Sequence, residues 1–172
     1  MKLKSYRKKS PWILHYNAGS CNGCDIEILA CLAPKYDVER FGIINTGNPK
    51  QSDILLVTGP VTKRSRERLV EIYAQMPEPK VVISCGACAS SGGVFRGMYN
   101  CEGGIDHYIP VDVYVCGCAC RPEQIIDGVV QALGILEQKT KDLEESVKLK
   151  KKALKEEGQI NRREIAAEIK IA

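Results

Sequence analysis

The sequence predicts an α/β fold with a mostly parallel β-sheet. Short apolar runs that suit buried strands alternate with segments of helical periodicity, a pattern typical of parallel sheets joined by helical crossovers. Loops rich in Gly and Cys follow several of these runs directly. In open α/β sheets, ligands bind at the edge formed by the carboxyl ends of the strands. The pattern therefore predicts both the fold and the edge on which a site would lie.

The first elements occupy the N-terminal part of the chain. Residues 13–16 form a predicted strand, and a Gly-rich turn leads from it to a predicted helix over 25–33. This helix carries Ile26 and Leu29 on one apolar face. Residues 38–44 are predicted to form the next strand, which ends at a turn-forming Thr-Gly-Asn-Pro sequence.

The central elements have clearer patterns. Residues 53–58 form an apolar run of the kind that is buried on both faces of a sheet. An amphipathic helix over 63–75 follows, with Leu69 directed inward. Residues 80–84 and 111–115 form the last two predicted strands.

The chain of 172 residues is long enough for one domain and an appendage. Residues 1–10 form a basic N-terminal arm, with five basic and no acidic side chains. Residues 11–138 form the domain, which a helix over 123–137 closes, with Pro122 at its first helical position. Residues 139–172 form a charged helical tail with ten basic and seven acidic side chains. Basic ends on an acidic body suit either contact with a partner or simple solvation.

Composition excludes several classes of protein. Aromatic residues make up 6% of the chain, which argues against stacking on nucleic acid. No stretch approaches the roughly 18 apolar residues of a membrane span, and the basic N-terminus lacks the apolar segment of a signal peptide. We therefore expect a cytoplasmic chain without a direct membrane span, in which structural disulfides are rare. The nine cysteines are then expected to be metal ligands or small buried side chains.

Seven of the nine cysteines lie in three loops that follow predicted strands. Because the carboxyl ends of parallel strands share one edge of the sheet, we expect these loops to bring distant cysteines together. The seven are Cys21, Cys24, Cys85, Cys88, Cys116, Cys118 and Cys120.

Four converging thiolates could hold either a structural zinc ion or an iron–sulfur cluster. Zinc ribbons place their two cysteine pairs about 15–20 residues apart, whereas these three groups lie tens of residues apart. The loops are also rich in Gly and Ser, which lets backbone amides approach cluster sulfurs. The residues favour an iron–sulfur site, and a binding protein stabilised by zinc on four cysteines is the alternative from another class.

Three stretches read Gly-Ser-Cys-Asn-Gly-Cys-Asp-Ile-Glu, Cys-Ala-Ser-Ser-Gly-Gly-Val-Phe and Val-Asp-Val-Tyr-Val-x-Gly-Cys-x-x-Arg-Pro-Glu. They resemble the small subunit of NiFe hydrogenases and the homologous small subunit of respiratory complex I. The resemblance covers residues 11 to about 136 and is strongest to membrane-bound, energy-converting hydrogenases and the related archaeal sulfane sulfur reductase. It implies a flavodoxin-like three-layer domain that carries one 4Fe–4S cluster.

By this resemblance, Cys21, Cys24, Cys88 and Cys118 are the cluster ligands. The Cys-x-x-Cys spacing of the first pair is similar to the hydrogenase branch, whereas the complex I branch has a tandem Cys-Cys at this place. The resemblance also implies a relay role without an active site of its own. Electrons would pass from a ferredoxin-fed cluster chain to the large catalytic subunit of a membrane-bound oxidoreductase.

The implied partners are that catalytic subunit, a ferredoxin-like multi-cluster subunit and membrane-embedded ion-translocating subunits, with no nucleic acid. The chain would then lie at the cytoplasmic side of the cell membrane. The terminal reaction would be sulfane sulfur reduction or hydrogen formation, and a quinone-reducing module similar to complex I is the alternative.

The chain departs from the family pattern where that pattern has prolines, because it carries Cys116, Ala119 and Cys120 there. Cys85 is a further extra cysteine. We expect the extra thiols to pack around the site, although each could in principle replace a ligand. Cys31, in the first predicted helix, is expected to be a packed small side chain.

Overall fold

The computed structural model describes residues 10–171, and it describes side chains up to residue 150. Contacts divide the chain into two units, Met1–Glu137 and Gln138–Ala172. The predicted basic arm, residues 1–10, falls almost wholly outside the described residues. The predicted domain boundaries therefore stay predictions.

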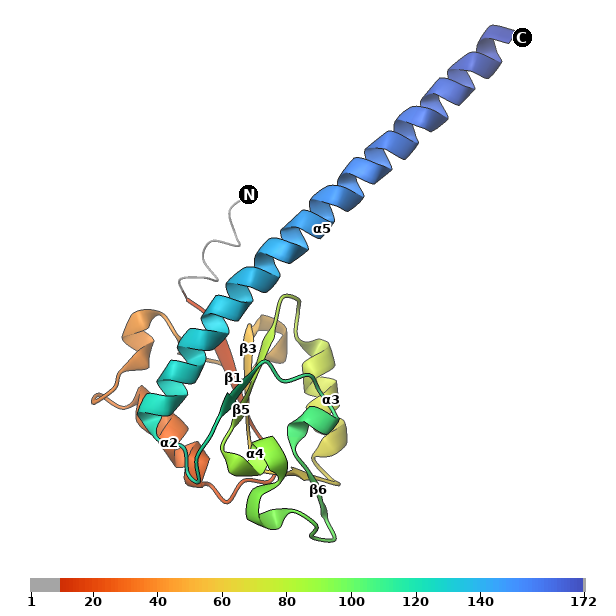
Figure 1. Cartoon of the computed structure of the whole chain (residues 1–172). Helices are drawn as coiled ribbons and strands as arrows, with labels where there is room; N and C mark the ends of the chain where they lie inside the picture. The colour runs from red at the N-terminus through yellow and green to blue at the C-terminus, as the bar shows by residue number, and fades with distance from the viewer. Residues whose placement is uncertain (1–9, 172) are drawn as a thin grey trace. The chain divides into compact units, whose positions relative to one another are not determined.

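Five parallel strands form the sheet of the first unit (Figure 1). Their spatial order is β2-β1-β3-β5-β7, which is the flavodoxin-like order with strands added on both sides of the first. All four neighbouring pairs are parallel. The predicted α/β, flavodoxin-like fold is confirmed. The strands are β1 (Trp12–Asn17), β2 (Ile44–Asn45), β3 (Ile54–Thr58), β5 (Val81–Cys85) and β7 (Val113–Val115).

Helices cover both faces of this sheet, so the unit has three layers (Figure 1). The α-helices are α2 (Gly23–Leu32), α3 (Arg66–Gln75), α4 (Ala87–Ser91) and α5 (Pro122–Ile171). Short 3-10 helices are η1 (Val38–Phe41), η2 (Pro49–Gln51), η3 (Gly93–Phe95) and η4 (Ile105–His107). A small antiparallel pair, β4 (Val61–Thr62) and β6 (Cys101–Gly103), forms a second sheet.

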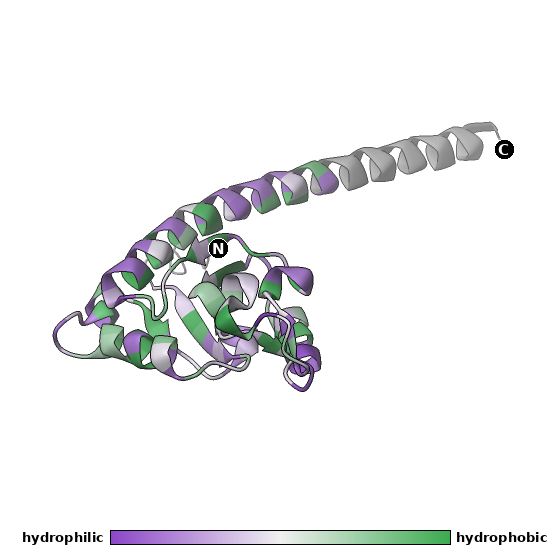
Figure 2. Cartoon of the chain, turned by 60° about the horizontal axis from the view of Figure 1, so that its bottom comes forward, coloured by the Kyte–Doolittle hydropathy of each residue, from purple (hydrophilic) through white to green (hydrophobic). Residues whose placement is uncertain are grey.

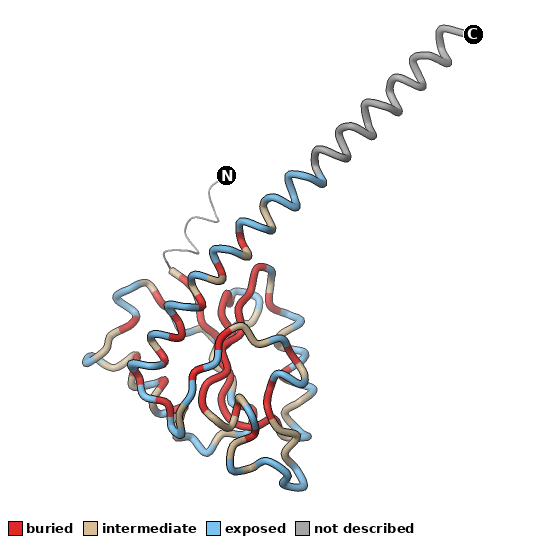
Figure 3. Tube along the Cα trace, viewed as in Figure 1, coloured by how far each residue is buried: buried red, intermediate tan, exposed pale blue. Residues whose placement is uncertain are grey.

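The strand β3 shows how the two halves of the core arise. Successive side chains of a strand point to opposite faces, so Ile54 and Leu56 enter the cluster under α2 and α5, whereas Leu55 and Val57 enter the cluster under α3. Each of these four side chains is at most 1% exposed. The strands are buried throughout the centre of the unit (Figure 3). This two-sided burial explains the continuous apolar runs in the sequence.

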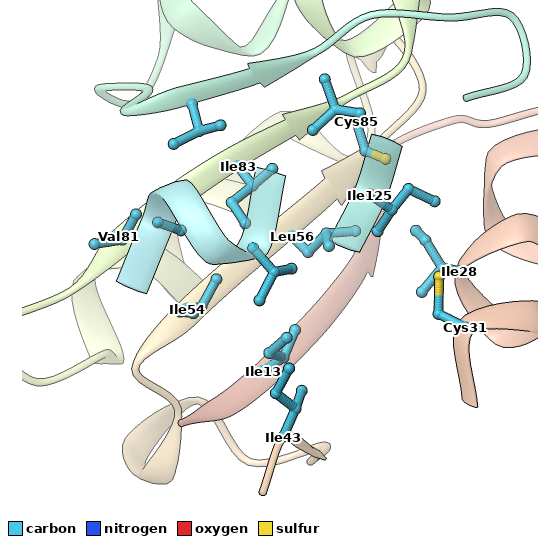
Figure 4. Packing of buried hydrophobic residues seen from close by; sticks show 14 of the residues in the cluster. Ile13, Ile28, Cys31, Ile43, Ile54, Leu56, Val81, Ile83, Cys85 and Ile125 are labelled. Carbon is cyan, nitrogen blue, oxygen red and sulfur yellow. The ribbon is translucent and has the colours of Figure 1, made fainter. Parts of the chain in front are cut away.

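The helix α2 packs on the sheet through the side opposite to the one that periodicity suggested. Ile28 and Cys31 are buried and point toward the sheet (Figure 4). Ile26 and Leu29, in contrast, are 62% and 57% exposed. The apolar face of this helix therefore exists, but it faces away from the core.

The predicted strand over 38–44 is wrong. Residues Val38–Phe41 form the 3-10 helix η1, and only Ile44–Asn45 join the sheet as β2. Asp37 and Gly42 flank η1 with φ values of 44° and 86°, a left-handed conformation that no continuous strand allows. The apolar residues Val38 and Ile43 are buried nonetheless.

The described residues of the second unit belong to the rest of α5. Hydrophilic and hydrophobic residues mix along the described length of this helix (Figure 2). Among the described residues, no helix combines the length and apolar character that crossing a membrane requires.

Replacing Leu69 by alanine tests the contact between α3 and the sheet. Leu69 is fully buried in the cluster beneath α3, so we expect Leu69→Ala to lower the free energy of unfolding by about 2–5 kcal/mol. Chemical denaturation of the full chain measures this. Its neighbour Val70 is 42% exposed, and Val70→Ala is the control, with an expected change below about 0.5 kcal/mol.

Candidate metal centre

The structure places the four predicted ligands in loops and helix starts at one edge of the sheet. Cys21 precedes α2 and Cys24 lies in its first turn, while Cys88 lies in the first turn of α4. Cys118 lies in the loop between β7 and α5. The pKa of the Cys88 thiol is raised by burial and by the charges of Cys118, Cys21 and Cys24. The four thiols therefore share one electrostatic neighbourhood, although they come from three separate loops.

A single zinc ion would require its thiolate ligands to lie close together. Two thiolates on one zinc ion lie about 3.8 Å apart, as tetrahedral bonds of about 2.3 Å require. Among the described side chains, no three His, Cys, Asp or Glu residues are grouped so as to hold one metal ion.

Two glycines let the backbone reach the sulfurs. A Cβ atom on Gly86 would lie 2.6 Å from Cys24 Sγ, and one on Gly93 would lie 2.9 Å from Cys88 Sγ. Both glycines have positive φ, 89° and 51°, which side chains other than glycine rarely adopt. The Val94 amide donates a hydrogen bond to Cys88, which lowers the pKa of that thiol and partly offsets its burial. Backbone amides that approach the sulfurs so closely are compatible with an iron–sulfur cluster, whose sulfurs accept hydrogen bonds.

A buried carboxylate fixes the start of α2. Asp25 is 9% exposed, and its oxygens contact His15 Nε2 at 2.7 Å, Asn17 Nδ2 at 2.7 Å and Thr58 Oγ1 at 2.5 Å. Asn17 Oδ1 also accepts hydrogen bonds from the amides of Gly19 and Ser20. The loop that carries Cys21 and Cys24 is thereby tied to β1 and β3.

Sequence reasoning missed this network. Asp25 directly follows a predicted ligand in a segment interpreted as a helix start, where an acidic residue usually faces solvent. The available signal was the combination of His15 and Asn17 on the preceding strand with Asp25 ten residues after His15. Contact with Thr58, from a different strand, has no local sequence signal.

The extra cysteines divide by burial. Cys85 and Cys120 are both fully buried, and their sulfurs lie 3.0 Å apart. Cys116 is exposed. Cys31 is buried with its thiol directed to the carbonyl of Glu27, and burial is the main reason that its pKa rises to about 11. Cys31 therefore packs as a small side chain, as the sequence predicts.

Comparison with known proteins decides the family. The pattern of the NADH ubiquinone oxidoreductase, 20 Kd subunit family matches residues 21–132. The chain belongs to this family. The match begins at Cys21 and spans all four predicted ligand positions.

Two curated relatives represent the two branches of the family. A probable membrane-bound hydrogenase subunit of Pyrococcus furiosus is 56% identical over 125 residues, which cover 73% of this chain and 75% of the relative. An NADH-quinone oxidoreductase subunit of Chlorobium limicola is 44% identical over 133 residues, covering 77% of this chain and 70% of the relative. The predicted resemblance to hydrogenase and complex I subunits is confirmed. This protein is therefore an oxidoreductase subunit of that type.

Two solved structures are also similar to this chain. A chain of the membrane-bound sulfane sulfur reductase, an archaeal respiratory complex, superposes with a TM-score of 0.69 at 38% identity, covering 80% of this chain and 77% of that one. A chain of an NAD+-reducing NiFe-hydrogenase superposes with a TM-score of 0.59 at 17% identity, covering 72% of this chain and 91% of that one. The second likeness shows the shared fold.

Adding a methyl group at Gly86 tests the close approach of the backbone to Cys24. We expect Gly86→Ala to lower the free energy of unfolding by more than about 1 kcal/mol, because the new Cβ meets the sulfur and the positive φ is strained. Gly47 has open space around it, so Gly47→Ala is the matched control and should change stability by at most about 1 kcal/mol. Equal effects of the two substitutions in chemical denaturation would contradict the close approach.

Proposed function

We propose that this chain carries one 4Fe–4S cluster, held by Cys21, Cys24, Cys88 and Cys118, and relays electrons to a catalytic subunit. The observation that carries the proposal is the meeting of the cysteine-bearing loops at the carboxyl edge of the sheet, where Gly86 lies against Cys24 Sγ and the Ala87 amide donates a hydrogen bond of 2.8 Å to the Gly117 carbonyl. When bound, the cluster supplies one-electron transfer. The chain's own residues supply the thiolates, the amide donors and the shielding of the site.

The two sides of the site suit a relay. Cys21 and Cys118 are exposed, whereas Cys24 and Cys88 are partly buried. A cluster held in this way lies near the surface on one side, where a partner can approach within electron-transfer distance. On the other side, Cys24 and Cys88 are backed by the protein.

An apolar surface beside the site offers a place for that partner. Ile26 and Leu29 on α2 are exposed, and so is Val94, whose amide contacts Cys88, at 77%. Exposed apolar side chains gathered around a functional site are typical of protein interfaces. We assign this surface, defined as Ile26, Leu29 and Val94, to the catalytic large subunit.

The similar proteins support a place for this chain in a membrane-bound complex of several subunits. A hydrogenase subunit and a sulfane sulfur reductase chain, both named as membrane-bound, are similar to this chain. We propose that electrons arrive from a ferredoxin-like multi-cluster subunit. They leave to a catalytic subunit that reduces sulfane sulfur or protons, coupled to ion translocation by membrane-embedded partners. The chain would lie peripherally on the cytoplasmic side.

A quinone-reducing module is the second candidate, since a subunit of NADH-quinone oxidoreductase is also similar. The Cys-x-x-Cys spacing of Cys21 and Cys24 favours the hydrogenase branch instead. The partner's sequence separates the two, because a hydrogenase-type large subunit carries two complete Cys-x-x-Cys pairs.

Replacing Cys118 tests the ligand set. We expect Cys118→Ala to lose the paramagnetic signal of the reduced 4Fe–4S cluster and most of the bound iron, since one thiolate of four is removed. Iron and sulfide analysis with electron paramagnetic resonance of the full chain measures this. Cys31→Ala is the matched control, because Cys31 is a buried cysteine outside the site, and it should keep the full signal. Zinc without iron in the unaltered chain would refute the proposal.

Introducing charged residues on the apolar surface tests its contact with the catalytic large subunit. We expect Ile26→Asp combined with Leu29→Asp to weaken association with the large subunit at least tenfold, since two exposed apolar contacts become desolvated carboxylates. Val70 is exposed on α3, which covers the other face of the sheet, so Val70→Asp is the control. Co-purification of the complex shows the difference. Full association of the double variant would exclude this surface.

A further inference from the structure

Basic side chains gather at the start of α3. The two ends of the chain hold fifteen of its 25 basic and seven of its 21 acidic residues, which leaves ten basic and fourteen acidic residues in 11–138. Four of those ten basic residues fall within the six residues from Lys63 to Arg68. Helices α2 and α3 pack on opposite faces of the sheet (Figure 1). A local concentration of positive charge on an acidic domain therefore lies across the sheet from α2.

Two of these four cations have no role in the local structure. Arg66 and Arg68 form ion pairs with neighbouring acidic side chains, with 3.1 Å and 2.6 Å between nitrogen and oxygen. Lys63 and Arg64, here called the basic pair, are exposed, and within residues 10–150 no acidic side chain forms an ion pair with either. The start of a helix carries a partial positive charge, so cations there destabilise the helix. The stability of α3 does not account for the basic pair.

The basic pair lies beside the loop that carries Cys21. A Cβ atom on Gly19 would lie 2.7 Å from Thr62 Cγ2, directly before the pair. Directly after the pair, Ser65 Oγ donates a hydrogen bond of 2.5 Å to the Ala18 carbonyl. Gly19 precedes Cys21 by two residues, which span at most about 7 Å. Contacts on both sides therefore hold the basic pair close to the proposed cluster site.

We propose that the basic pair is the docking surface for an acidic protein that donates electrons to the cluster. The inference rests on the proposed function, in which electrons enter and leave through different partners. The apolar surface that includes Ile26 and Leu29 takes the catalytic subunit, so the donor requires another surface beside the site. Electron-transfer partners bury little area, and opposite charges bring them together faster than neutral surfaces do. Positive charge on an otherwise acidic domain directs an acidic donor to this place.

Stopped-flow reduction of the cluster tests this on the full chain loaded with its cluster, with a reduced two-cluster ferredoxin as the acidic donor. We expect Lys63→Glu combined with Arg64→Glu to lower the second-order rate constant about tenfold at low ionic strength. Added salt should slow the reaction of the unaltered chain and should not slow that of the double variant. Arg40→Glu combined with Lys50→Glu is the matched control. It makes the same change in charge at exposed residues before β2 and β3, and should lower the rate constant less than about threefold.

The double variant should keep its iron, its paramagnetic signal and its free energy of unfolding, because both altered residues are exposed. Equal rate constants for the double variant and the control would overturn the inference, as would a rate constant of the unaltered chain that does not depend on salt. Loss of iron from a folded double variant would make the basic pair a support of the site instead. If the double variant does not fold, Lys63→Gln combined with Arg64→Gln carries the test, with an unchanged rate constant as the contrary result.

Anionic lipid is the competing partner for a basic surface. Binding of the unaltered chain to phosphatidylserine vesicles, lost in the double variant while the ferredoxin reaction is unchanged, would assign the basic pair to a membrane surface and overturn the inference. Absence of any cluster signal from the unaltered chain would overturn the proposed function, which separates the two failures.

Discussion

The parallel register of four strands is the constraint on which the site depends. Asn17 pairs with Thr58, Thr58 with Cys85, and Cys85 with Val115, so the four strands reach their carboxyl ends in one row across the sheet. A cysteine-bearing loop leaves three of these four ends. Hydrogen bonding between strands thus fixes the relative positions of loops that are tens of residues apart in the chain. A slip of one residue in any pair would displace a ligand and reverse which side chains enter the core.

The site also requires the backbone to approach the cysteine sulfurs closely, and this approach depends on the parallel register of the strands. The glycines at 86 and 93 lie against Cys24 and Cys88, which belong to different loops or turns from one another. Gly93 and Cys88 are local neighbours, whereas Gly86 and Cys24 come from different loops, so their contact forms only when the sheet has already placed both. Asp25 also stabilises the position of the first cysteine-bearing loop, because its partners His15 and Thr58 come from two neighbouring strands. The site is therefore built by contacts between elements rather than within one motif.

Much of this could be predicted from the sequence, for identifiable reasons. The strands β3 and β5 are buried on both faces, so their composition alone identifies them. The region of Val38–Phe41 has strand-like apolar residues, but they are buried from a 3-10 helix, and periodicity does not distinguish the two over so short a run. The face of α2 that carries Ile26 was predicted as apolar, yet no sequence pattern says whether the core or another protein covers it. Likewise, the spacing of the cysteines does not show whether Cys85 or Cys88 is the ligand.

The departures from the family pattern make physical sense when they are separated by burial. Cys116 is exposed, whereas Cys120 is fully buried and its sulfur lies 3.0 Å from that of Cys85. A proline at position 120 would have neither a thiol nor an amide hydrogen. A cysteine in its place adds both at a buried position beside the Cys85 thiol. In a shielded place each hydrogen-bond donor acts more strongly than in water, so the buried departure at position 120 has a larger effect on its surroundings than the exposed one at position 116.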